Sequence, residues 1–416
     1  MSEGLPGISR ANVTHSPRCR CTRVRTRLLV PVLAVLLSAF AVPSRSATPA
    51  PVPADFYGTW YDALSHTSAE NTPKLDAQAS MGMGAIRQYM WWDRMEVRPG
   101  VYDWTRMDEV VKDTTARGIA LVPTLLYTPA FYSSKPAGAT GSTQYPPKDP
   151  RTMAAYATAL IERYGPRGTY WCPPLVPAFV PQAQAAAVRD AVPCDDSKAL
   201  RTWEVWNEPD LKAWWKGRAS AAEYADLLRT VSAAIKKADP GAEVVLGSLT
   251  GAQAAKRGGF LEQLYKLGAA KSFDTIAFNP YAPSVRDMIT RIRDVRTIAA
   301  AYGDGAKPIR ILEYGWATGG RSPITTVSSA CQAALLYAGT VRLAEVRTEF
   351  RLRSIAQFQW QDSPARSTAW PDYAGVVTVE GTNKPALSAL AAAVGGEPAP
   401  AGASLASCPV ERRAVR

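Results

Sequence analysis

Strand-like apolar runs alternate with helical segments along most of this chain, and this alternation constrains the fold more than any other feature. Regular alternation of this kind is typical of parallel α/β proteins. A doubly wound open sheet would show the same pattern, but eight units without a glycine-rich phosphate motif favour a closed barrel. We therefore predict an α/β protein, a (β/α)₈ TIM barrel with a single catalytic domain. The eight runs are Phe56–Ala63, Gly84–Met90, Ile119–Leu126, Thr202–Asn207, Ala242–Ser248, Thr275–Asn279, Ile309–Tyr314 and Ser354–Trp360.

Capping residues mark the starts of the predicted helices. Asp149 and Pro150 suit the N-cap and first turn of a helix that ends at Tyr164. Ser220 and Glu223 have the spacing of a capping box, in which each side chain bonds the backbone of the other. The remaining helices are predicted at Val285–Ala301, Thr325–Glu345 and Pro385–Val394.

The first 47 residues have the features of a secretory signal peptide. An Arg-rich stretch precedes the apolar run Leu28–Val42, and small residues follow it. The run is short for a membrane span, although an uncleaved anchor is an alternative. Residues 48–54 then form a Pro/Ala linker, residues 55–396 the predicted barrel domain and residues 397–416 a flexible tail. We expect a secreted, extracellular protein without membrane attachment after cleavage.

Charge and histidine content argue against two classes of function. The chain holds 48 Lys and Arg against 36 Asp and Glu, a formal net charge of +12. Its first 47 residues contribute seven Arg and one Glu, so the rest carries 41 minus 35, or +6, without a long basic run. Nucleic-acid binding therefore gains little support. The only histidines are His15 and His66, which argues against a zinc site with several His ligands, and we expect no metal and no cofactor.

A Pro-rich insertion at residues 165–200 interrupts the alternation between the third helix and the fourth strand. Because it leads from a helix into a strand, we expect it at the end of the barrel away from the active site. Two of the six cysteines lie in the leader, and the other four suit disulfides of an exported protein, with three possible pairings. We expect Cys172 to pair with Cys194, which closes the insertion, and Cys331 to pair with Cys408.

Two glutamates end predicted strands, where barrel enzymes place catalytic groups. Glu208 stands in Asn207-Glu208-Pro209 at the end of the fourth strand, and Glu313 ends the seventh. Cleavage of a glycosidic bond needs one protonated carboxyl group and one ionised carboxylate. The structural alternative is that Glu208 caps a helix and Glu313 pairs with an Arg. Strand alternation places Glu204 on a different face from Asn207, and we expect it to pair with an Arg as a structural group.

This arrangement resembles the clan A glycoside hydrolases, retaining enzymes on a (β/α)₈ barrel. The resemblance extends from Phe56 to about Val394, and the stretch Arg87–Trp104 looks like the second barrel unit of family 39 and its relatives. It implies that Glu208 is the acid/base and Glu313 the nucleophile. A retaining mechanism requires a separation of about 5–5.5 Å between the two carboxyl groups, which we expect here.

The same resemblance implies roles for four further residues. Asn207 would bond the sugar 2-hydroxyl. Arg87, at the end of the second strand, would lie near Glu313 and keep it ionised. Tyr281 would donate a hydrogen bond to the nucleophile. The clan often has His where this chain has Asn279, so Asn279 is a substrate-binding candidate whose role stays open.

Twelve tryptophans provide flat apolar surfaces on which sugar rings can pack. Trp316 follows Glu313, and Trp360 ends the eighth strand, so we expect both to bind substrate. We expect Trp60, Trp104 and Trp203 to fill the core.

We therefore predict a secreted, cofactor-independent, retaining glycoside hydrolase. It would act as a monomer and cleave O-glycosidic bonds of a β-linked oligo- or polysaccharide by double displacement. Endo action on a polysaccharide and exo action on a xyloside both stay open. The alternatives are a catalytically inactive barrel that binds carbohydrate, and a transglycosidase that uses the same residues.

Overall fold

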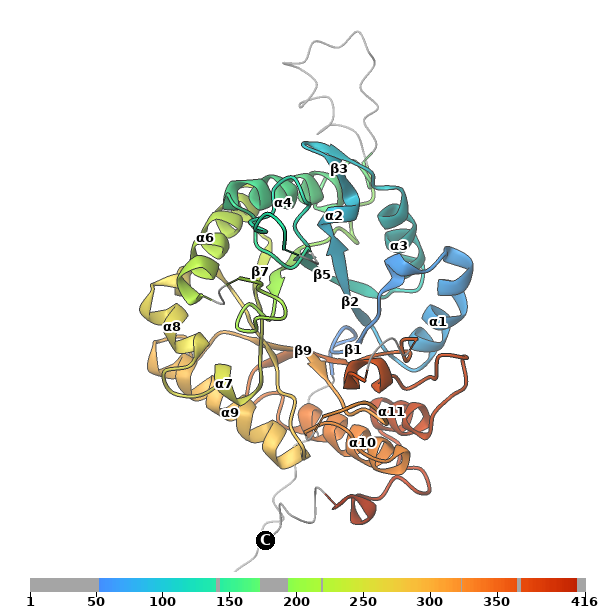
Figure 1. The fold of residues 1–416 in the computed structure, drawn as a ribbon. Coiled ribbons are helices and arrows are strands. Elements are labelled where there is room, and N and C mark those ends of the chain that lie inside the picture. Colours follow the sequence, from blue (N-terminus) through green and yellow to red (C-terminus); the bar gives the residue numbers. More distant parts are fainter. Residues whose placement is uncertain are drawn as a thin grey trace, which may run out of the picture. The chain divides into compact units, whose positions relative to one another are not determined.

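A closed barrel of eight parallel strands forms the centre of the molecule (Figure 1). The computed structural model describes residues 52–139, 143–172, 194–217, 220–322, 324–364 and 368–409, so the predicted leader lies outside the described residues. The strands follow the order β1-β10-β9-β8-β7-β6-β5-β2 around the barrel, which confirms the predicted (β/α)₈ fold. They are β1 (Tyr57–Trp60), β2 (Ala85–Trp91), β5 (Ala120–Leu126), β6 (Thr202–Asn207), β7 (Glu243–Thr250), β8 (Ile276–Asn279), β9 (Ile309–Tyr314) and β10 (Leu352–Gln357).

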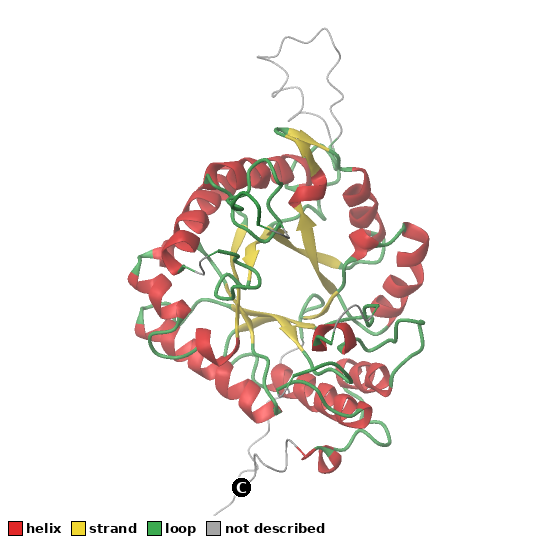
Figure 2. Ribbon diagram, viewed as in Figure 1, coloured by secondary structure: helices red, strands yellow, loops and turns green. Residues whose placement is uncertain are grey.

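Helices surround the strands as an outer layer (Figure 2). The longer ones are α1 (Ser68–Ser80), α3 (Thr105–Thr115), α4 (Pro150–Tyr164), α6 (Ala221–Ala238), α8 (Phe260–Lys266), α9 (Val285–Ala301), α10 (Ser329–Glu345) and α11 (Pro385–Gly395). Short elements decorate the loops: α2 (Trp92–Met95), α7 (Gly251–Ala254), the hairpin β3 (Glu96–Arg98) with β4 (Val101–Tyr102), and the 3₁₀ helices Ala63–Ser65, Ala269–Ser272, Trp370–Tyr373 and Leu405–Ser407. Within the described part of the chain, no helix has the length and apolarity needed to span a membrane.

The start of one helix differs from the sequence prediction because another residue caps it. Helix α10 begins at Ser329 rather than Thr325, because the Ser328 side chain accepts a hydrogen bond from the backbone of the first turn. Ser220 caps α6 as predicted, but the Glu223 carboxylate accepts a hydrogen bond from the Trp215 indole. Helices α1, α3 and α8 were not assigned from the sequence, and α1 contains Pro73, a residue that normally ends a helix.

A charged pair and an apolar layer fill the N-terminal part of the barrel interior. At the N-terminal ends of the strands, Arg310 donates two hydrogen bonds to Glu243, at 3.0 and 2.6 Å. Burial alone would raise the pKa of Glu243, but the bonds and charge of Arg310 lower it to about 2. An apolar layer contributed by four strands fills the interior: Val122, Val245, Ala277 and Leu312. Side chains therefore fill this end of the barrel, and the open end is the C-terminal one.

Both predicted disulfides are present. Cys172 bonds Cys194 across the insertion, and Cys331 of α10 bonds Cys408. The described ends of the insertion connect the end of α4 to the start of β6, the side of the barrel expected from the sequence; residues 173–193 lie outside the described residues. The second disulfide joins α10 to part of the predicted tail.

We predict that removing the first disulfide destabilises the protein. The bond closes a loop with a sequence separation of 22, so Cys172→Ser/Cys194→Ser should lower the free energy of unfolding by about 3 kcal/mol on the chain-entropy account. Denaturant unfolding would measure this loss. Peptide mapping without reduction should recover the 172–194 and 331–408 pairs, and a 172–331 peptide or free thiols would contradict the assignment.

Candidate active site

Arg87 lies at the centre of a buried charged network near the C-terminal end of the barrel. Its side chain donates to both carboxylate oxygens of Glu204, each at 2.8 Å, and to Asn207 Oδ1 at 2.7 Å. Its Nη1 atom also donates to Glu313 Oε1. The planar guanidinium makes all these bonds at once, so one side chain connects β2 with β6 and β9. Arg87 is the third residue of β2 rather than its last, so it reaches Glu313 from inside the barrel.

Glu204 pairs with an Arg as predicted, but the prediction that it faces away from Asn207 is wrong. Both side chains bind the same guanidinium. The reason is Trp206, whose φ of 72° is uncommon for a residue with a Cβ and interrupts the alternation of the strand. The Trp206 indole instead donates to the Trp214 carbonyl at 2.9 Å.

Glu313 is a buried carboxylate surrounded by hydrogen-bond donors. Tyr281 donates to its Oε2 atom at 2.8 Å, and Arg87 and Tyr89 donate to its Oε1 atom. Burial raises the pKa of Glu313 above its usual value, and the Arg87 charge and the Tyr281 hydroxyl offset only part of this rise. These donors stabilise the ionised form of Glu313.

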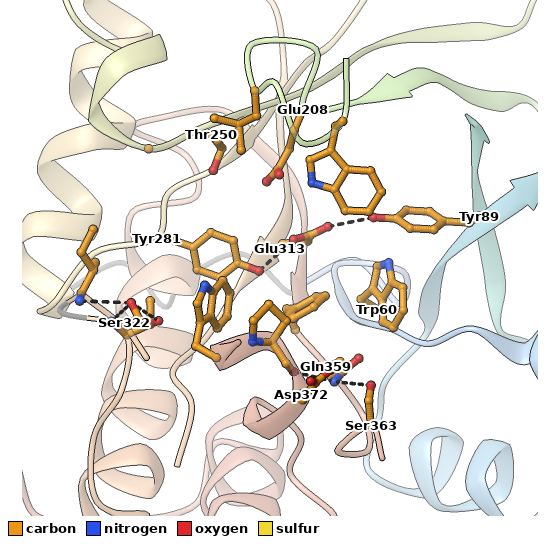
Figure 3. Close-up of a pocket in the computed structure, with 18 of the residues that line it drawn as sticks. Trp60, Tyr89, Glu208, Thr250, Tyr281, Glu313, Ser322, Gln359, Ser363 and Asp372 are labelled. Carbon is orange, nitrogen blue, oxygen red and sulfur yellow. Dashed lines mark hydrogen bonds between the residues drawn. The ribbon is translucent and has the colours of Figure 1, made fainter. Parts of the chain in front are cut away.

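Glu208 has a different environment, although it projects into the same cavity as Glu313 (Figure 3). Its Oε1 atom accepts a hydrogen bond from the Asn279 amide at 2.9 Å, whereas Arg87 binds Glu313 instead. Burial and the neighbouring Glu313 carboxylate raise the pKa of Glu208 to about 8. At neutral pH, Glu208 therefore holds a proton that it can donate, and Asn279 contacts this group directly.

The cavity that contains both carboxyl groups has a volume of about 880 Å³. This size is within the range of small-molecule sites. The aromatic side chains that line the cavity are Trp60, Tyr89, Trp91, Tyr127, Trp214, Tyr281, Phe358 and Trp370. Flat aromatic rings suit the apolar faces of sugar rings, and the carboxyl and amide groups of the cavity can form hydrogen bonds with sugar hydroxyls. In the described ranges, no group of three or more His, Cys, Asp or Glu side chains could hold a metal ion.

Two of the tryptophans expected in the site do not line this cavity. Trp316 is buried, and its indole donates to the Ala282 carbonyl at 2.9 Å, so it packs in the core. Trp360 lies beyond the end of β10, is 3% exposed and borders an adjacent cavity. Trp60, expected in the core, instead lines both the catalytic cavity and the adjacent one.

Several cavity residues are absent from the substrate-binding residues predicted from the sequence. Tyr89 could have been included, because it follows Arg87 at two-residue spacing along β2 and so shares its face, as does Trp91. Phe358 directly follows β10, where the chain leaves regular alternation. Trp370 lies in a 3₁₀ helix of the last loop, and its ring reaches Tyr281 with 4.8 Å between centroids. No local pattern identifies such a contact.

No protein-family profile and no curated protein sequence matches this chain. Solved structures do match its fold. A monomeric β-xylosidase from Caulobacter crescentus CB15 is 20% identical with a TM-score of 0.58, over 82% of this chain and 68% of that one. A family 39 glycoside hydrolase from Bacteroides cellulosilyticus WH2 is 18% identical with a TM-score of 0.58, over 82% and 63%. An exo-β-1,4-mannosidase from Opitutaceae bacterium strain TAV5 is 17% identical with a TM-score of 0.56, over 83% and 62%.

These neighbours are glycoside hydrolases, and the fold of this chain is the (β/α)₈ barrel that they share. The chain spans about two thirds or less of the length of each. The structural likeness therefore supports the barrel fold that the sequence motifs predict.

We predict that the two carboxyl groups titrate as a coupled pair. Glu313→Gln removes a negative charge beside Glu208, so the pKa of Glu208 should fall below its value of about 8. Side-chain ¹³C NMR titration would measure the shift. The exposed variant Glu349→Gln is the matched control and should leave this pKa unchanged, and equal shifts in both variants would contradict the coupling.

Proposed function

We propose that the protein is a retaining glycoside hydrolase that cleaves a β-linked glycan, with Glu208 as the acid/base and Glu313 as the nucleophile. The observation that carries this proposal is the unequal environment of two carboxyl groups in one aromatic cavity. Arg87 and Tyr281 bind Glu313, which favours its ionised form, while burial and the Glu313 charge favour the protonated form of Glu208. A carboxyl group bound by a cation and a second one without a cationic partner among the described residues suit the ionised and the protonated role that a glycosidase requires.

In the first step, the Glu208 proton passes to the glycosidic oxygen while a Glu313 oxygen attacks the anomeric carbon. The bond between that carbon and the leaving oxygen breaks, and a glycosyl ester forms on Glu313. In the second step, Glu208, now ionised, takes a proton from water. The resulting hydroxide attacks the anomeric carbon, which releases the sugar and restores both carboxyl groups.

Two buried amides supply further groups for the substrate. The Asn207 Nδ2 and Asn279 Oδ1 atoms lack hydrogen-bond partners within the described residues, while the opposite ends of these amides bind Arg87 and Glu208. A buried polar atom without a partner is costly, so a sugar hydroxyl at these positions would be stabilised. We assign to Asn207 the contact with the 2-hydroxyl, and to Asn279 the orientation of Glu208 together with substrate contact.

We also propose that the protein is exported from the cell. The apolar leader resembles a signal peptide, and two disulfides join pairs of cysteines far apart in the chain. Disulfides persist in oxidising compartments, which agrees with an extracellular enzyme that meets a polysaccharide outside the cell. We propose that it acts there as a monomer.

We predict that azide distinguishes the two carboxyl roles. Glu313→Ala should abolish turnover, and azide should restore cleavage with inverted product, because the anion occupies the space of the missing nucleophile. Glu208→Ala should retain activity on dinitrophenyl β-glycosides, whose leaving group needs no proton, and azide should then give retained product. Product configuration by ¹H NMR is the measurement.

Other outcomes of this experiment have definite meanings. Exchanged phenotypes would reverse the two roles, and inverted product from the wild type would exclude a retaining mechanism. Glycan binding without any product would favour the inactive carbohydrate-binding barrel. Transfer to added sugar acceptors in preference to water would favour the transglycosidase.

We predict that Arg87→Lys is damaging although it keeps the charge. An ammonium group cannot reproduce the fixed pair of bonds to Glu204 and the bond to Glu313. The expected loss in kcat/KM is on the order of 10²-fold, or about 2.7 kcal/mol of transition-state stabilisation. Circular dichroism would establish that the variant folds, and near-normal kinetics in folded protein would mean that Arg87 serves only the scaffold.

A further inference from the structure

A second cavity of about 400 Å³ adjoins the catalytic one. Four residues line both cavities: Trp60, Asp62, Gln359 and Ser363. Trp60 ends β1, and Gln359 follows β10, so the second cavity lies over these two strands. The two cavities therefore form neighbouring compartments along one surface.

The second cavity lies on the side of Glu313 that is opposite to Glu208, which indicates the part of a substrate that it could bind. Glu208 follows β6, which is opposite β10 in the closed strand order. Figure 3 shows Glu208 on one side of Glu313, with Gln359 and Ser363 on the other. Since the acid lies beside the leaving oxygen, the departing part of the substrate lies towards β6. The opposite direction, towards β1 and β10, is that of the sugars on the non-reducing side of the bond.

The lining of the second cavity suits a sugar ring. The half-buried His66 ring supplies the flat group of this cavity, and it is held by stacking on the buried Tyr61 ring, with centroids 5.6 Å apart and planes 10° from parallel. Lys74 Nζ lies 5.7 Å from the centroid of the same Tyr61 ring and supplies a donor. Val379, 40% exposed, adds an apolar surface. Flat and apolar groups beside donors are the elements of sugar recognition.

Trp60 stands at the junction of the two cavities. Its indole Nε1 atom is buried and lacks a hydrogen-bond partner among the described residues. A buried donor without an acceptor is costly, and a sugar hydroxyl passing from one cavity to the next would satisfy it.

We propose that the second cavity binds the sugar units next to the reacting sugar on its non-reducing side, so that the substrate is a glycan chain rather than a single terminal sugar. This inference rests on the proposed hydrolase function and extends it to the class of substrate. Contacts remote from the reacting bond then contribute binding energy that raises the rate for longer substrates.

The test compares long and short substrates in the full-length mature protein. The long ones are β-1,4-linked tetrasaccharides of xylose, glucose and mannose, and the short ones are 4-nitrophenyl β-glycosides of the same sugars. His66→Ala and Lys74→Gln should each lower kcat/KM for the cleaved tetrasaccharide by about 10-fold and leave the aryl glycoside unchanged. Lys112→Gln, on the exposed face of α3, is the matched control and should change neither.

The outcomes separate this inference from the proposed function. Release of only single terminal sugars, at a rate independent of chain length, would overturn the inference while hydrolysis stands. Equal kinetic effects of the variants on both substrates would overturn it as well. If no substrate is cleaved, the proposed function fails. Calorimetry with the tetrasaccharides then tests the cavity directly, and Lys74→Gln should weaken binding relative to Lys112→Gln.

Discussion

The buried guanidinium of Arg87 is the interaction on which the site depends. It binds Glu204 through two nitrogens and Glu313 through a third, and it orients Asn207. Removing one partner of a buried ion pair commonly costs about 3–5 kcal/mol, because the remaining charge stays desolvated. Burial and the charge of the neighbouring Glu313 favour the protonated form of Glu208, while Arg87 offsets part of the Glu313 charge. The same guanidinium therefore holds the strands together and influences the protonation of the two candidate catalytic carboxyl groups.

An irregular backbone at the end of β6 allows the side chains there to reach Arg87, which a regular strand would not. Trp206 and Glu208 both have positive φ, at 72° and 44°. Such conformations are uncommon outside glycine and occur often at functional sites. At Trp206 the effect is specific: Glu204 and Asn207 both reach Arg87, and the large indole packs away from the barrel interior. A regular strand would have separated the structural carboxylate from the amide.

The positions of the aromatic residues could be predicted only in part from the composition of the sequence. An abundance of tryptophan agrees with the aromatic lining of the cavity, yet two individual tryptophans predicted to bind substrate do not line it. Trp316 packs in the core, although it follows Glu313 in the chain, while Trp60 lines the cavity. Phe358 and Trp370 enter the site from the last loop. The direction in which a side chain points at the end of a strand depends on the local twist and on the following loop. Adjacency to a catalytic residue in the sequence does not specify either.

The sequence by itself determined the barrel, the eight strands to within a few residues and the placement of Glu208 and Glu313 at the open end, and it favoured the cysteine pairs that the structure contains. These follow from periodicity, capping and loop closure, which are local properties or depend on few long-range choices. Only the tertiary structure decided which face Glu204 takes, where Trp360 lies and how two cavities meet at Trp60. Those features arise from side chains that converge from distant strands and loops, and their positions depend on the packing of the whole barrel.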